Sequence, residues 1–160
     1  MKKLKVYLET SFWNYLFADD YPEEKSATEN IFTNVRNGGI EGYISEIVIR
    51  ELTEAPAPKR EKMLEKISES KVSVLEISPD VEYLSEEYLL NRAIPEGKRG
   101  DALHVAIATV YELDALLTWN QRHLANLRRR ELVHGINLKS GYLKPIEIIT
   151  PEEVIIDETE

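Results

Sequence analysis

The sequence contains no cysteine. This absence excludes disulfide bonds, thiolate metal sites and a cysteine nucleophile. No apolar run reaches the roughly 18 residues that a membrane-spanning helix needs. The opening stretch, "MKKLKVYLETSFW", lacks the uninterrupted apolar segment of a secretory signal. We therefore expect a cytoplasmic protein that does not enter the membrane.

Common phosphate-handling motifs are also missing. Neither G-x-x-x-x-G-K-[ST] nor G-x-G-x-x-G occurs, which argues against the usual nucleotide-binding loops. The first strand-like run is followed by "LETS" and not by the Asp-x-Asp pair that one large class of phosphatases needs. The net charge is -9, so a nucleic acid would bind only through a local basic patch or through bound cations.

Strand-like and helical segments alternate along the chain. Its 160 residues show no repeat, no low-complexity tract and no long linker, so we expect a single domain over residues 1–160. The alternation predicts an α/β fold, a three-layer α/β/α sandwich around a parallel sheet of about four to five strands. Ligands of such folds bind outside the carboxyl ends of the strands. The predicted strands are residues 4–8, 42–44, 72–77, 115–119 and 146–150, and the predicted helices are 10–18, 22–37, 45–54, 59–70, 79–94, 101–112 and 122–134.

Two acidic residues lie where this fold would place a site. Glu9 directly follows the predicted strand 4–8, so it stands at the carboxyl end of that strand. Glu51 lies on the apolar face of the predicted helix 45–54, in phase with its isoleucine, valine and leucine positions. Burying a lone carboxylate is costly, so such a group is normally paired, protonated or bound to a metal.

A length argument brings two more polar residues to the same place. Asp101 opens an almost entirely apolar helix, and Asn120 follows the next strand. That helix rises about 18 Å at roughly 1.5 Å per residue, and the strand returns about as far at roughly 3.3 Å per residue. Asp101 and Asn120 should therefore lie level with each other, and Asp114 at the opposite edge of the sheet. Three carboxylates and an amide oxygen would suit Mg²⁺ or Mn²⁺.

Three segments resemble a known family. "VYLETSFWNYL", "ISEIVIREL" and "GDALHVAIATVYELDALLTWNQRHLAN" are similar to the PIN domain, and in particular to the VapC-like ribonuclease toxins of prokaryotic toxin–antitoxin pairs. In that family, four polar residues at these places hold one or two divalent metals, and they match Glu9, Glu51, Asp101 and Asn120. Glu9 and Asn120 depart from the pattern, because the first position is usually Asp and the last is often Asp.

The resemblance implies a PIN-like fold and metal-assisted hydrolysis of RNA, with 5′-phosphate and 3′-hydroxyl products. Glu9, Glu51 and Asp101 would hold Mg²⁺ or Mn²⁺, and Asn120 would position the attacking water or a second ion. The resemblance also implies a homodimer that is silenced by a small antitoxin protein.

Contacts to RNA are expected from one polar residue in the site and from a basic stretch that follows it. The polar residue is Thr10, next to Glu9, whose hydroxyl could bind a phosphate. The basic stretch would supply the positive charge that the chain as a whole lacks. Its candidate residues are Arg122, Arg128 and Arg129.

Each candidate residue also has a structural alternative. Glu9 would be a solvated strand-end residue, Asp101 a helix cap, and Asn120 a turn residue. Glu51 would form a salt bridge to one of three arginines. His104, on the same side of its helix as Asp101, is expected to be a hydrogen-bonded structural residue rather than a ligand. The arginines considered for Glu51 are Arg50, Arg92 and Arg99.

Two functions remain open at this point. The first is the metal-dependent ribonuclease. The second is a PIN-like domain with weak or no hydrolysis that serves as an RNA-binding or protein-interaction module, and the departures at Glu9 and Asn120 favour it. Metal binding through Asp101 distinguishes the two.

Overall fold

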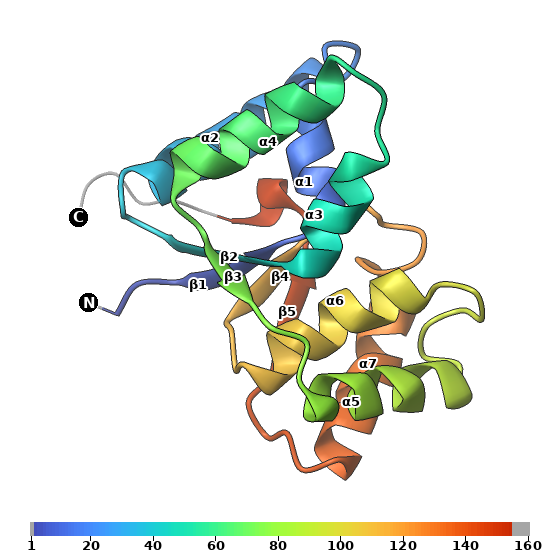
Figure 1. The fold of residues 1–160 in the computed structure, drawn as a ribbon. Helices are drawn as coiled ribbons and strands as arrows, with labels where there is room; N and C mark the ends of the chain where they lie inside the picture. The colour runs from blue at the N-terminus through green and yellow to red at the C-terminus, as the bar shows by residue number, and fades with distance from the viewer. Residues whose placement is uncertain (1, 155–160) are drawn as a thin grey trace.

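Five short parallel strands form the centre of the protein, whose computed structural model describes residues 2–154 (Figure 1). Their order across the sheet is β3-β2-β1-β4-β5. All neighbouring pairs run parallel, so the predicted parallel sheet is confirmed. The strands are β1 (Lys5–Leu8), β2 (Glu41–Ser45), β3 (Ser73–Leu75), β4 (Ala115–Leu117) and β5 (Glu147–Ile149).

Helices cover both faces of the sheet and complete the predicted three-layer α/β/α sandwich (Figure 1). The first four α-helices and the C-terminal 3-10 helix lie on one side, and the last three α-helices lie on the other. None of the helices within residues 2–154 is long and apolar enough to cross a membrane. The predicted domain 1–160 also includes residues 1 and 155–160, which lie outside the described residues. The helices are α1 (Thr10–Tyr15), α2 (Pro22–Arg36), α3 (Glu46–Thr53), α4 (Lys59–Ser70), α5 (Pro79–Leu90), α6 (Arg99–Val110), α7 (Leu127–Lys139) and the 3-10 helix η1 (Pro151–Glu153).

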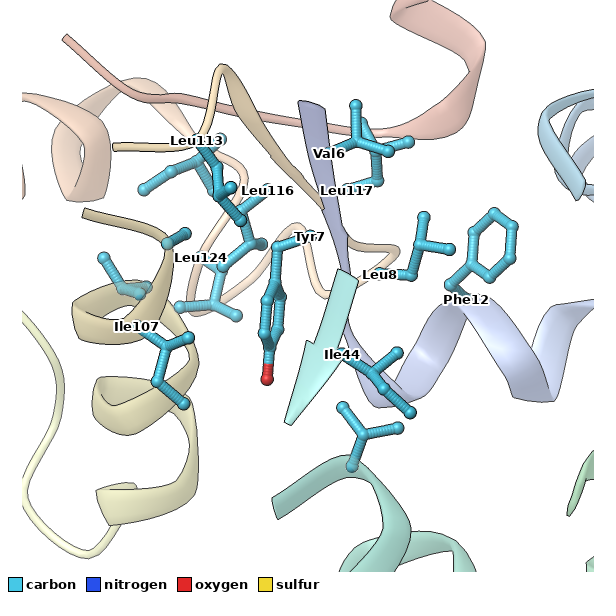
Figure 2. Packing of buried hydrophobic residues seen from close by; sticks show 14 of the residues in the cluster. Val6, Tyr7, Leu8, Phe12, Ile44, Ile107, Leu113, Leu116, Leu117 and Leu124 are labelled. Carbon is cyan, nitrogen blue, oxygen red and sulfur yellow. The ribbon is translucent and has the colours of Figure 1, made fainter. Parts of the chain in front are cut away.

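The central strand, β1, is buried on both faces, as expected for a strand between two helical layers. Tyr7 and Leu8 have no exposed surface. Successive side chains of a strand point to opposite faces. Figure 2 shows Leu8 lying beside Phe12 of α1, whereas Tyr7 extends the other way, between α6 and β2. The end of β1 is therefore held from both sides, which gives the residue after it a defined position.

The strand order reverses between β1 and β4. The chain leaves β1 toward β2 and β3, and later returns to the other side of β1 as β4. Open α/β sheets bind ligands at such a reversal, outside the carboxyl ends of the strands. Leu8 is paired with Leu117 in the last register position of both strands. The residues that follow, beginning with Glu9 and Thr118, consequently lie side by side.

Most helix boundaries differ from the predicted ones by a few residues, and the largest differences are in α7 and α5. The predicted helix 122–134 is α7, which begins later because Asn126 caps it: the side chain of Asn126 accepts a hydrogen bond from a backbone N–H of the first turn. The predicted helix 79–94 is α5, which ends earlier. The chain turns away soon after its end, where Arg92 has a φ of 57°, in the left-handed region typical of helix ends.

Candidate active site

Glu9 directly follows β1 and serves as the N-cap of α1. Its Oε2 accepts hydrogen bonds from the backbone N of Ser11 (2.9 Å), from the Ser11 hydroxyl and from the Thr118 hydroxyl (2.8 Å). Glu9 is only 6% exposed, so the alternative of a solvated strand-end residue is wrong. One carboxylate oxygen is thus bound to the protein on both sides of the β1–β4 reversal.

Glu51, on α3, is held in a similar way. Its Oε1 accepts a hydrogen bond from the Thr10 hydroxyl (2.7 Å) and lies 2.5 Å from His104 Nε2. Burial acts to raise the pKa of Glu51, but the bonds from His104 and Thr10 outweigh burial and hold this pKa below its ordinary value. The ion-pair partner is therefore His104 and not one of the three arginines. The side chain is 36% exposed, so the core-facing position still opens toward solvent.

His104 is completely buried and links Glu51 to polar groups deeper in the core. Its Nδ1 lies 2.6 Å from the Tyr7 hydroxyl, which lies 2.8 Å from the Ser45 hydroxyl. The expectation of a hydrogen-bonded His is confirmed. Burial acts to lower the pKa of His104, but the bond to Glu51 and the nearby carboxylates outweigh it and raise this pKa. Burial raises the pKa of Tyr7 well above its ordinary value, so Tyr7 keeps its proton.

Asp101 and Asn120 lie side by side, as the length argument predicts. Asn120 Nδ2 is 3.4 Å from Asp101 Oδ2. α6 begins before Asp101 and has Lys98 as its N-cap residue, without a side-chain cap. The alternative of Asp101 as a helix cap is therefore wrong, since it lies inside the first turn. Burial, assisted by the charge of Glu9, raises the pKa of Asp101 to about 6.

Asn120 also fills the turn role that was its structural alternative. Its Oδ1 accepts a hydrogen bond from the backbone N of His123 (3.0 Å), and its own backbone N donates to the Thr118 hydroxyl (3.0 Å). The amide oxygen expected to help at a metal site is thus already hydrogen-bonded. The amide Nδ2 is the group that points to Asp101.

The three acids suit a divalent cation by their chemistry. Within residues 2–154, no hydrogen bond reaches Glu9 Oε1 and no Lys or Arg forms an ion pair with Glu9 or Asp101. Glu51 Oε2 lies beside Gly100, where a Cβ would stand only 3.2 Å away. Hard carboxylate oxygens fit Mg²⁺ or Mn²⁺. Within residues 2–154, no three His, Asp or Glu side chains are grouped to hold one ion together, so waters would complete the coordination of an ion bound by fewer of them.

Positive charge collects beside the acids, around His123. Partial burial lowers the pKa of His123, and the charges of Lys98, Arg122 and Arg129 lower it further. Lys98 and Arg122 are exposed. Sequence reasoning missed Lys98, although "GKRGD" places it three residues before Asp101. The basic groups that flank the site thus come from two separate segments.

The two neighbouring arginines of α7 differ. Arg128 is exposed, with no hydrogen bond from its side chain within residues 2–154. Arg129 donates from Nη1 to the carbonyl oxygens of Arg92 (3.2 Å) and Ala93 (3.0 Å). Arg128 therefore lies on a solvated face of α7, whereas Arg129 ties α7 to the turn after α5.

Comparison with known proteins identifies the family. The profile of the PIN domain matches residues 6–130. The chain belongs to the PIN domain family. The matched range includes all four candidate residues of this PIN domain, and the resemblance seen in the sequence is confirmed. No curated protein sequence matches the chain.

Solved structures share the fold of this PIN domain. VapC20 of Mycobacterium tuberculosis, described as a Sarcin-Ricin loop cleaving toxin, has a TM-score of 0.58 at 16% identity, over 73% of this chain and 91% of that one. VapBC2 of Rickettsia felis, bound to a DNA fragment from its promoter, has a TM-score of 0.54 at 18% identity, over 91% of this chain and 98% of that one. At these identities the likeness shows the fold.

Proposed function

We propose that this PIN domain is a metal-dependent ribonuclease that hydrolyses RNA phosphodiester bonds. The observation that carries the proposal is the meeting of Glu9, Glu51 and Asp101 beyond the end of β1, close enough for burial and the neighbouring charges to raise the pKa of Asp101 to about 6. Acids gathered without a Lys or Arg partner favour a bound cation. The structural neighbour VapC20 is described as a toxin that cleaves the Sarcin-Ricin loop, which supports the same kind of substrate here.

Each site residue has its own part in this proposal. Glu9, Glu51 and Asp101 would hold Mg²⁺ or Mn²⁺, which, when bound, polarises a phosphate and acidifies a water. Asn120 would orient the water through its amide group. Thr10 already donates its hydroxyl to Glu51 (2.7 Å), so its first task is to orient that carboxylate. A phosphate contact from Thr10 would come second. The expected products carry a 5′-phosphate and a 3′-hydroxyl.

The RNA backbone would run along the basic groups beside the acids. Lys98 and Arg122 are exposed next to His123, and Arg128 is exposed on the first turn of α7. A phosphate bound there loses counterions, which gives salt-dependent affinity. Arg129 would contribute through its field, since its Nη1 is engaged by backbone carbonyls. This local patch would offset the net charge of -9.

We further propose that this nuclease is the toxin of a toxin–antitoxin pair in the cytoplasm, and that it forms a homodimer. The support is the shared fold with VapC20 and VapBC2. A small antitoxin protein would then silence the nuclease. Copurification of the neighbouring gene product with this chain, and the mass of the purified chain in solution, would test the two parts separately.

The second candidate is a PIN domain with weak or absent hydrolysis that binds RNA or protein. Two observations favour it. Asn120 stands where the family often has an acid, and its Oδ1 is occupied by the backbone N of His123. Within residues 2–154, no three acids are grouped to hold one ion together. Metal binding separates the candidates, because a pure binding module is indifferent to Mn²⁺.

The decisive experiment is Mn²⁺-dependent cleavage of a mixed RNA pool by the wild type and by Asp101→Asn. We expect at least about a 100-fold loss in the variant, since it removes a direct ligand and loss of mere outer-shell partners costs 10- to 100-fold. The matched control is Asp80→Asn, an exposed Asp in the first turn of α5, which should cut like the wild type. Equal and negligible cleavage by wild type and Asp101→Asn would replace the ribonuclease with the binding module.

A further inference from the structure

A chain of buried hydrogen bonds runs from the start of α3 to the carboxylate near its other end. Ser45 is the N-cap of α3, and its hydroxyl accepts from the backbone N of Ile47 (3.2 Å). From Ser45 the chain passes to Tyr7 of β1 (2.8 Å), to His104 of α6 (2.6 Å) and to Glu51 of α3 (2.5 Å). Figure 2 shows the Tyr7 hydroxyl at the far end of its ring, between α6 and β2. The two ends of one helix are thus joined through a strand and a second helix.

The first three members of this chain are inaccessible to solvent. Ser45, Tyr7 and His104 have no exposed surface, whereas the Glu51 side chain is 36% exposed. Burying an imidazole and a phenol hydroxyl costs more than burying apolar groups of the same shape, unless every polar atom is paired. The series of hydrogen bonds pairs every buried polar side-chain atom of these residues. Its last bond is made to Glu51, the one member that faces the site.

The two carboxylate oxygens of Glu51 have different surroundings. An ionised carboxylate only accepts hydrogen bonds, so Nε2 of His104 donates, as does the Thr10 hydroxyl. Both donors bind Oε1. Oε2 is thereby turned toward Gly100, where the missing Cβ leaves it room, and Gly100 directly precedes Asp101. A Glu side chain left free would lose rotamer entropy on binding an ion.

We propose that His104, held by Tyr7 and Ser45, is a positioning residue that fixes the Glu51 carboxylate with Oε2 presented beside Asp101 for metal binding. The inference rests on the proposed function, because it concerns the same site. His104 touches neither metal nor RNA in this arrangement. It orders the Glu51 carboxylate before the metal binds, as outer-shell partners of metal-bound carboxylates do.

The test is the affinity for Mn²⁺, measured by isothermal titration calorimetry without RNA. His104→Leu fills the same space without a donor and should weaken Mn²⁺ binding about 10- to 100-fold. His104→Gln keeps a donor near the position of Nε2 and should recover most of that loss. Tyr7→Phe keeps the ring, removes the hydroxyl that holds His104, and should weaken binding about 3- to 10-fold. His134→Leu, at an exposed His of α7, is the matched control and should bind like the wild type.

A second readout does not depend on the metal. In crystal structures of metal-free His104→Leu or Tyr7→Phe, we expect the Glu51 carboxylate to take more than one orientation. Wild-type affinity in a folded His104→Leu, or no difference between the Leu and Gln variants, would overturn the positioning role while the ribonuclease stands. A wild type that binds no Mn²⁺ and cuts no RNA would overturn the proposed function, and the positioning role with it.

Discussion

Helix α6 takes part in two buried polar networks, one in each half. In its first half, His104 joins Tyr7 to Glu51. In its second half, Thr109 lies 3.3 Å from the Tyr88 hydroxyl, and its own hydroxyl donates to the carbonyl oxygen of Val105 (3.0 Å). Each network contains the hydroxyl of a fully buried tyrosine, Tyr7 in the first and Tyr88 in the second, so their differences show what each one does.

The second network is closed and neutral. The Tyr88 hydroxyl donates to Asn137 Oδ1, and Asn137 Nδ2 donates back to the Thr109 hydroxyl (3.3 Å). Tyr88, Thr109 and Asn137 come from α5, α6 and α7, and all are at most 4% exposed. Burial raises the pKa of Tyr88 above its ordinary range, so no member ionises. This network can only hold three helices together, whereas the first one ends at an ionised, half-exposed carboxylate.

The largest effect that would test this contrast is the loss of one hydroxyl in the closed network. Tyr88→Phe leaves Asn137 Oδ1 buried without its donor, and we expect the free energy of unfolding to fall by about 2 kcal/mol. Mn²⁺ affinity should stay at the wild-type value, unlike in Tyr7→Phe. Urea unfolding and calorimetry on both variants measure the two quantities. A Tyr88→Phe protein that is as stable as the wild type but binds Mn²⁺ more weakly would contradict the separation of a structural network from a metal-site network.

The second effect is a pH dependence that belongs to the site alone. The pKa of Asp101 is raised to about 6 by burial and by the charge of Glu9, so folding favours its protonated form. Its contribution to stability is present below its ordinary pKa and is lost as pH rises toward 6. Asp101→Asn removes this loss, because the amide does not ionise. Without metal, the free energy of unfolding of the variant should exceed that of the wild type by about 1–2 kcal/mol at pH 7, after a discount for partial exposure, and by little at pH 4.

Urea unfolding in the presence of a chelator checks this at both pH values. The pKa of Glu51 shifts in the opposite direction through its bonds from His104 and Thr10, and these contacts are present in both proteins. Tyr88→Phe is the control, since its effect on stability should not change between the two pH values. If the stability difference between Asp101→Asn and wild type is the same at both pH values, the pKa of Asp101 is not raised in the folded protein.

The smallest effect concerns the adjacent arginines Arg128 and Arg129, of which we expect the first to serve RNA binding and the second to serve stability. Arg128→Ala should weaken RNA binding a few-fold and reduce the salt dependence by about one phosphate contact, without loss of stability. Arg129→Ala removes the donor to the carbonyls of Arg92 and Ala93 and should cost about 1 kcal/mol of stability. Filter binding at several salt concentrations and thermal unfolding separate the two. Identical behaviour of the two variants would count against both roles.

Much of the site could be derived from positions along the chain. The lengths of α6 and β4 bring Asp101 level with Asn120, and the same argument correctly sends Asp114 to the other edge, where it accepts a hydrogen bond from the backbone N of Lys5 at the start of β1. Helical phase placed Glu51 on the inner face of α3. These inferences work because the rise per residue and the turn per residue are properties of the backbone, independent of the rest of the chain.

The sequence alone thus determined the layers, the end of the sheet at which the acids meet, and the family. The tertiary structure decided which atoms touch there. His104 and Tyr7 are 97 positions apart, and Glu9 and Thr118 are 109 apart; no local pattern links them. Whether Nε2 of His104 reaches Glu51 depends on how α6 is rotated and packed against β1 and α3, and that rotation is set by all the side chains of the core together.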